Sequence, residues 1–414
     1  MHFNQYFFVG FITLAGFACS PYDGYNSSDS PAKTEILPTF YANASSGAMI
    51  EGDRMTVLDR EVKLIHEFSV SEFTRKTTVT VPFLSDQQWF LTGKNAAYYV
   101  IVGKTDYAIN GIAGVEVKNP VQLTENIAGV AFSPSKGKLI VADEFLSMAV
   151  VSLNDAGVVT GTYKGGPNVG TDTAVSAGAI MNDGRFVVSQ GDDKISIIDL
   201  DATIRDQAWR IQRTFTLSKA KGISWLSPVN GFDHLILVKD SSRIMLVDVN
   251  AQTISGIEVD VSGKEVTYSF RDAVPHFITS DVSAREVHPV QLVYVDSAGA
   301  LQTRTLRAPG TRIRRSWLSP DSGRLNLMYL DSGSSSDNTY AASTVYRYRY
   351  ADGVLLDKSE IKESVQVGMS NEYLFLRYDS PLGKMERRTY GSDPVRDTVS
   401  AYNLPFLQDN YRRR

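Results

Sequence analysis

From about residue 60 onward, short apolar stretches alternate with clusters of the turn-forming residues Gly, Pro, Asn, Asp and Ser. Apolar and polar side chains alternate around residues 79–81, and a β-strand places such neighbours on opposite faces of a sheet. Residues 139–141 and 186–188 are instead wholly apolar, as expected for strands that are covered on both faces. The pattern therefore predicts an all-β body built from many short strands.

A longer phrase recurs within this pattern. It begins with a small residue and alternating apolar positions, continues with Ser-Pro or Asn-Asp near a Gly, and ends in an apolar strand. Small residues suit a first strand that lines a central channel, and the Ser-Pro-Asp-Gly segment supplies hairpin turn chemistry. The four clearest copies are residues 129–141, 178–188, 222–228 and 317–325.

The spacing of the phrase predicts the architecture. With three fainter copies included, its turn residues are Ser85, Ser133, Asn182, Ser227, Ser280, Ser319 and Ser370. Their mean separation of about 47 residues falls within the roughly 40–50 residues of a four-stranded propeller blade. The sequence thus predicts a single all-β β-propeller with seven four-stranded blades. Six or eight blades stay open, because the copies at Ser280 and Ser370 are the faintest. Residues 62–81 are expected to supply a strand that closes the ring against the last blade.

The repeated phrase resembles the repeats of the TolB, YVTN and lactonase-like propellers over about four-fifths of the chain. The resemblance implies the fold. It does not imply one function, because these propellers include scaffolds, lactonases, quinoproteins and partners of peptidases.

The amino terminus carries an export signal. Residues 6–18 form an apolar run that is too short to span a membrane and suits a signal peptide. The single cysteine, Cys19, follows directly and resembles the lipidated cysteine of bacterial lipoproteins. Gly16 stands where that motif has an aliphatic residue, and no Lys or Arg precedes the apolar run. A secreted or periplasmic protein with a free thiol is the alternative. Ser20 after the cysteine favours the outer membrane of the cell envelope.

These features divide the chain into four parts. We expect a signal peptide at residues 1–18, a lipid-anchored disordered linker at 19–60, the propeller at 61–395 and a tail at 396–414. The linker is rich in Ser, Asn, Asp, Gly and Pro, and it has too little apolar surface to order itself.

Composition excludes several classes of function. The net charge of −4 gives no basis for binding nucleic acid, which usually requires a basic surface. The presence of a single cysteine excludes an intramolecular disulfide and a zinc site of the Cys type.

No motif for catalysis, a metal or a cofactor stands out. The histidines lack metal-binding spacing, and Ser224 lacks the second glycine of a nucleophile elbow, so we interpret it as structural. A lactonase-like calcium site would need converging carboxylates. We favour turn roles for the candidates, because Asp readily bonds to its own backbone. They are Asp143, Asp192, Asp193, Asp240 and Asp331.

A basic segment is the candidate partner-binding site. Residues 301–350 hold eight Arg against three Asp, and residues 346–350 alternate Tyr with Arg, so one strand would present each type on its own face. Arg and Tyr are enriched at protein interfaces. A solvated outer strand is the alternative. The candidate residues are Arg312, Arg314, Arg315, Tyr346, Arg347, Tyr348 and Arg349.

The sequence therefore favours a non-enzymatic envelope lipoprotein that acts as a protein-binding scaffold or assembly subunit. We expect its partner to be an envelope protein or an anionic envelope polymer, and we expect no cofactor. A lactonase- or quinoprotein-like enzyme that uses the central channel is the alternative.

Overall fold

In a computed structural model, the described residues of the chain form eight four-stranded antiparallel sheets. The structure describes residues 48–400, with gaps at 52, 60–63, 81–88, 95–96, 112–115, 144, 146, 167–174, 230, 272–273, 282–289, 307–312, 319–323, 331–342, 362–363, 370–372, 379–383 and 392–395.

Each sheet consists of four strands that are consecutive in the chain, and we number the sheets 1 to 8 in chain order. Sheet 1 contains β1 (Ala48–Glu51), β2 (Arg54–Asp59), β3 (Leu64–Ser69) and β4 (Arg75–Thr80). Sheet 2 contains β5 (Trp89–Thr92), β6 (Tyr98–Val102), β7 (Tyr107–Gly111) and β8 (Glu116–Lys118). Sheet 3 contains β9 (Ile127–Ser133), β10 (Lys138–Asp143), β11 (Met148–Leu153) and β12 (Val159–Gly165). Sheet 4 contains β13 (Val175–Ile180), β14 (Phe186–Gln190), β15 (Lys194–Ile198) and β16 (Ile211–Thr216).

The second half of the chain continues in the same way. Sheet 5 contains β17 (Trp225–Val229), β18 (Phe232–Lys239), β19 (Arg243–Asp248) and β20 (Thr253–Asp260). Sheet 6 contains β21 (Lys264–Arg271), β22 (Val274–Asp281), β23 (Val290–Val295) and β24 (Leu301–Leu306). Sheet 7 contains β25 (Ile313–Leu318), β26 (Arg324–Leu330), β27 (Ser343–Arg349) and β28 (Leu355–Ile361). Sheet 8 contains β29 (Ser364–Met369), β30 (Tyr373–Tyr378), β31 (Lys384–Thr389) and β32 (Arg396–Ser400).

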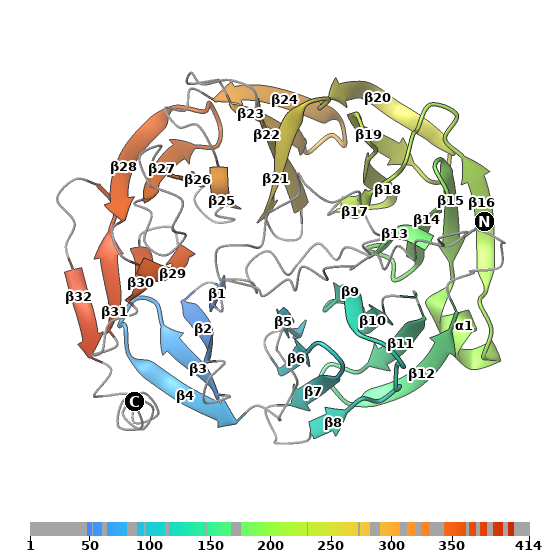
Figure 1. Cartoon of the computed structure of the whole chain (residues 1–414), viewed down its shortest axis with the longest axis horizontal. Helices are drawn as coiled ribbons and strands as arrows, with labels where there is room; N and C mark the ends of the chain where they lie inside the picture. The colour runs from blue at the N-terminus through green and yellow to red at the C-terminus, as the bar shows by residue number, and fades with distance from the viewer. Residues whose placement is uncertain are drawn as a thin grey trace, which may run out of the picture.

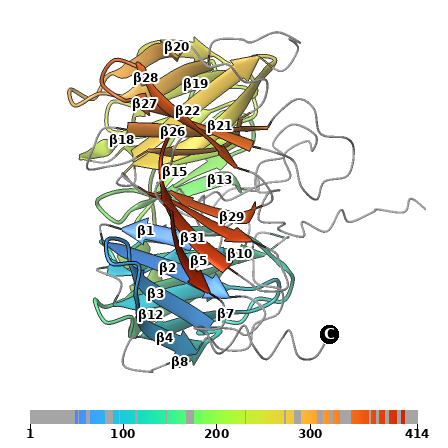
Figure 2. The ribbon, with the colours of Figure 1, turned by 90° about the vertical axis from the view of Figure 1, so that its left-hand side faces the viewer.

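The sheets stand around a common axis as the blades of a β-propeller (Figure 1). The first strand of each sheet lies nearest the axis, and the fourth strand lies at the rim. Figure 2 shows the same ring from its side, with sheets 1 and 8 next to each other. Among the described residues, the one helix, α1 (Leu200–Asp206), joins β15 to β16. Asp199 caps its N-terminus, and the Asp199 side chain accepts a hydrogen bond from Ala202 N. No described helix is long and apolar enough to cross a membrane.

The wholly apolar second strands are buried on both faces, as the sequence predicts. In β10, Leu139 and Val141 belong to a core cluster that they share with Val100 of sheet 2. The intervening Ile140 and Ala142 belong to a different cluster, shared with sheet 4. A strand between two neighbouring sheets needs apolar residues on both faces, which explains why its sequence does not alternate.

The turn that follows the third strand is alike in several sheets. In five sheets it carries an Asp or Asn whose side chain accepts a hydrogen bond from backbone N–H groups two to four residues later. This local bonding is the usual way in which such side chains stabilise turns. The five residues are Asn154, Asp199, Asp248, Asp296 and Asp352.

The structure changes three of the sequence-based expectations. The described part of the chain forms eight sheets, whereas the spacing of the phrase favours seven blades and leaves eight open. The strands begin at Ala48, so residue 61 is too late a start for the propeller, and they continue to Ser400, beyond the expected end at 395. The phrase identified at Ser280 lies within the second strand of sheet 6, and it does not mark the first turn of that sheet. The phrase gives one blade too few, because sheet 1 lies before its first copy, at Ser85.

Ring closure also differs from the prediction. The segment at residues 62–81 was expected to pair with the last blade, but β3 and β4 pair within sheet 1. Sheets 1 and 8 meet instead through side chains. Arg387 on β31 donates from Nη1 to Val70 O at 2.7 Å and also to Ser71 O, both in the turn after β3. Its guanidinium lies 5.2 Å from the ring centroid of Phe73 and 4.5 Å from that of Tyr373.

Candidate functional site

The Tyr-Arg segment lies on β27, the third strand of sheet 7, and the predicted alternation is present. Tyr346, Tyr348 and Tyr350 face sheet 6, where they form a cluster with apolar residues that include Leu292 and Leu306. Arg347 projects to the opposite side and forms an ion pair with Asp357 on β28. Both faces of the strand therefore pack within the ring.

Arg347 is largely enclosed. Its side chain is 14% exposed, its Nε lies 3.0 Å from Asp357 Oδ2, and its guanidinium lies 4.4 Å from the ring centroid of Tyr390 in sheet 8. Arg304 similarly contacts aromatic rings at the boundary between sheets 6 and 7. It lies over the rings of Tyr294 and Tyr350 and donates to Tyr294 Oη at 3.0 Å. Two of the eight arginines of residues 301–350 thus make contacts between sheets.

The other predicted partner-binding residues differ in their surroundings. The Arg349 side chain is 53% exposed and pairs with Asp352 at 2.8 Å. Arg314 and Arg315 lie on β25, the strand of sheet 7 nearest the axis, and their side chains are outside the described part. Arg312 and Cys19 lie outside the described residues.

Sequence analysis missed an exposed apolar surface next to Arg349. Val354, Leu355 and Leu356 are consecutive and 49%, 44% and 38% exposed. Leu355 and Leu356 begin β28, the rim strand of sheet 7, and Val354 directly precedes it. We call these three residues the rim patch. The free energy of the system falls when large apolar side chains leave water. An exposed run of such side chains therefore commonly marks a contact site.

The rim patch has an apolar residue at a β-bulge, where three other sheets have a polar one. The register between β27 and β28 pairs Arg347 with Asp357 and Tyr348 with Leu355, which leaves Leu356 as the additional residue. Sheets 1, 3 and 4 have the same bulge at the start of their rim strands. The residue at the bulge in those sheets is polar and exposed, namely Lys76, Thr160 and Gln212. The strand registers are needed to show that these three residues and Leu356 occupy equivalent positions. The sequence alone therefore did not identify Leu356 as an exposed bulge residue.

Two of the carboxylates considered for a calcium site, Asp143 and Asp240, bond to nearby backbone groups. Asp143 Oδ1 accepts from Phe145 N at 3.0 Å and from Ser147 N at 2.8 Å. Asp240 Oδ1 accepts from Ser242 N at 2.8 Å and from Arg243 N at 2.6 Å. Asp192 and Asp193 lie in the β14–β15 turn, and Asp331 lies outside the described residues. Within the described ranges, no group of three or more His, Cys, Asp or Glu is arranged to hold a metal ion.

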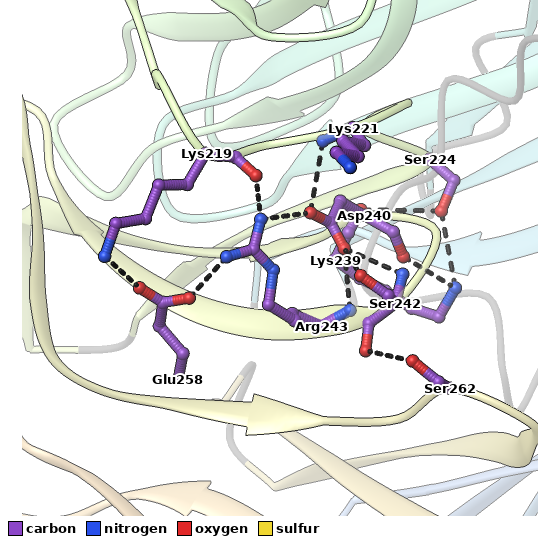
Figure 3. A network of polar contacts seen from close by, with 9 residues as sticks. All are labelled: Lys219, Lys221, Ser224, Lys239, Asp240, Ser242, Arg243, Glu258 and Ser262. Atoms are coloured by element: carbon purple, nitrogen blue, oxygen red, sulfur yellow. Dashed lines mark hydrogen bonds and ion pairs between the residues drawn. The ribbon is translucent and has the colours of Figure 1, made fainter.

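Asp240 belongs to a polar network at one end of sheet 5, where β18 passes to β19 (Figure 3). Arg243 links two carboxylates, donating from Nη1 to Glu258 at 2.5 Å and from Nη2 to Asp240 at 3.1 Å. Burial acts to raise the pKa of Asp240, but hydrogen bonds from Ser242, Arg243 and Lys221 hold the pKa below its ordinary value. Asp240 is therefore a charged group that is fully engaged within the protein.

Lys239 lies beside this network without a comparable partner. Its Nζ contacts Ser224 Oγ and the backbone oxygen of Asp240, each at 3.4 Å. Burial lowers the pKa of Lys239, and the charge of Asp240 offsets this effect only in part. Ser224 therefore lies next to a partly desolvated ammonium group, a neighbour that sequence analysis did not foresee.

Comparison with solved structures agrees with the fold. The chain is similar to apo AztD from Citrobacter koseri, with 12% identity, a TM-score of 0.53, and coverage of 84% of this chain and 94% of that one. It is also similar to the dihydro-heme d1 dehydrogenase NirN, with 11% identity, a TM-score of 0.52, and coverage of 84% and 73%. No protein-family model and no curated protein matches the chain. At such low identity these likenesses show the fold, and this chain is an all-β propeller.

Proposed function

We propose that this protein is a non-enzymatic scaffold of the bacterial cell envelope, tethered through Cys19, that docks a partner protein on the rim of its propeller. A ring of sheets that pack against one another provides a rigid body on which surface segments can carry binding residues. The rim patch is the observation that carries this proposal.

The rim patch has the properties of a contact surface. It places three large apolar side chains in water on a strand whose outer edge has no neighbour within its sheet. The unpaired N–H and C=O groups at such an edge can pair with another chain. Natural sheets usually prevent this pairing with charged or polar residues. The polar residues at the equivalent bulges of sheets 1, 3 and 4 follow this rule, whereas Leu356 departs from it.

The neighbouring charges indicate the chemistry of the partner. Arg349 pairs only with the exposed Asp352 among the contacts described for its side chain, and an exposed ion pair contributes little free energy. A partner carboxylate can compete for Arg349 while apolar partner residues cover the rim patch. The proposal is therefore a partner protein with an apolar surface bordered by acidic residues.

Leu356→Asp tests this proposal. The substitution places a charge at the centre of the contact, and we expect it to weaken partner binding by about 2–3 kcal/mol, or roughly 30–150-fold. Crosslinking and affinity capture from native membranes, followed by mass spectrometry, identifies the partner. Binding of the purified pair is then measured with both forms of the protein.

Thr160→Asp is the matched control, because Thr160 occupies the same bulge position in sheet 3. It adds the same charge to the same kind of strand and should leave affinity unchanged. Equal affinity of wild type and Leu356→Asp, or equal losses in the two variants, would contradict a docking role for the rim patch.

Cys19→Ala tests the tether. If Cys19 is acylated, the substitution removes the lipid, and the protein should pass from the membrane fraction to the soluble fraction of the envelope, since membrane binding then has no acyl chains to support it. Fractionation with immunoblotting measures this change. Cys19→Ala protein that stays in the membrane fraction as fully as wild type would refute the anchor.

A further inference from the structure

Lys239 occupies an unusual position for a lysine. It lies at the end of β18 in the same row as Leu235 and Leu237, which pack against Val293 and Val295 of sheet 6. The strand register places it opposite Trp225, another member of that apolar cluster. The lysine is thus partly withdrawn from water at the boundary between sheets 5 and 6.

The ammonium group is incompletely satisfied. It has three N–H donors, and its two described contacts are long ones to neutral oxygens, the hydroxyl of Ser224 and the carbonyl of Asp240 (Figure 3). No described carboxylate forms an ion pair with it. The nearby Asp240 carboxylate is already engaged by Arg243 and by three backbone N–H groups.

The surroundings are positively charged. The nine residues in Figure 3 include four basic side chains, Lys219, Lys221, Lys239 and Arg243, but only two carboxylates, Asp240 and Glu258. Both carboxylates are bound by Arg243. On the sheet 6 side, Lys264 at the start of β21 adds a positive charge, but it donates to the Asp260 carbonyl at 2.9 Å and interacts with the Asp260 carboxylate. Among the described contacts, Lys239 therefore forms no ion pair of its own, although the Asp240 charge lies nearby.

We propose that Lys239 and Ser224 form a binding site for a small oxyanion, a phosphate or carboxylate group, at the boundary of sheets 5 and 6. The site extends beyond the docking role of the rim patch, because it lies on a different sheet and involves none of its residues. Lys239 would supply the charge and a free N–H. The Ser224 hydroxyl, which donates to the Lys239 carbonyl at 3.4 Å, would rotate to supply a second donor. Charge-assisted hydrogen bonds of this kind are stronger than neutral ones, and partial burial strengthens them further.

NMR of the protein labelled with ε-¹³C-lysine tests the site, with inorganic phosphate and acetate as separate probes. The resonance of Lys239 is assigned by its loss in Lys239→Gln. We expect a bound anion to shift this resonance and to raise the pH at which it titrates. A response to phosphate alone or to acetate alone identifies the class of anion. No response to either probe would overturn the proposal.

Two variants give a second measurement through the backbone amide resonances of Ser224 and Asp240. Lys239→Gln should weaken anion binding about tenfold or more, because a charged hydrogen bond is lost. Lys219→Gln removes a charge from the same network but leaves Lys239 in place, and it should change affinity about twofold or less. Thermal unfolding verifies that both variants are folded. Equal binding by Lys239→Gln and wild type would overturn the site.

Discussion

Arg387→Ala is expected to destabilise the protein by about 3–5 kcal/mol, from the combined loss of charged hydrogen bonds and cation–π contacts. Sheets 1 and 8 share no strand, so their contact depends on side-chain packing and on hydrogen bonds such as those of Arg387. Arg387 is 9% exposed, and its guanidinium reaches the Val70 and Ser71 carbonyls from between Phe73 and Tyr373. Alanine would leave both carbonyls and both rings without this partner.

Urea unfolding measures the predicted change, and hydrogen exchange should show that β1–β4 and β29–β32 open more readily than the other sheets. Arg205→Ala is the control. Its guanidinium pairs with the adjacent Asp206 and its side chain is 71% exposed, so a change below about 0.5 kcal/mol is expected. A loss of stability in Arg387→Ala no greater than in Arg205→Ala would show that Arg387 does not hold the ring closed.

Gly157→Ala is expected to cost about 3–4 kcal/mol, because it combines an unfavourable backbone conformation with a steric overlap. Gly157 has a φ of +81°, and a Cβ atom there would lie 2.6 Å from both Cβ and Cγ of Tyr98 in sheet 2. Tyr98 cannot readily move away, because it is fully buried and Gly93 lies against the other end of its ring. The turn between β11 and β12 therefore packs against Tyr98 only when residue 157 lacks a side chain.

Gly256→Ala separates the two contributions. Gly256 has a similar φ of +76°, but nothing lies within 4 Å of a Cβ at that position. Its substitution should cost only the backbone component, about 1 kcal/mol. Thermal and urea unfolding of the two variants give the difference. Equal losses of unfolding free energy in the two variants would mean that the overlap with Tyr98 does not destabilise Gly157→Ala.

The candidate sites were only partly predictable. Sequence analysis identified the alternation of Tyr and Arg on β27, and the structure confirms that the two residue types occupy opposite faces. It did not show that Arg347 would meet Asp357 and Tyr390, because Tyr390 belongs to another sheet. The rim patch could not be predicted either, because Leu356 becomes the bulge residue only through the register between β27 and β28.

The amino-acid sequence by itself determined the all-β class, the four-stranded repeat and its turns. These properties depend on neighbouring residues: apolar runs form strands covered on both faces, and Asp199 and Asp248 bond to nearby backbone groups. Only the tertiary structure decided the number of sheets, the closure by Arg387 and the surroundings of Lys239. Those features depend on which sheets become neighbours. Arg387 meets Val70 across more than three hundred residues of sequence, and no local pattern encodes that contact.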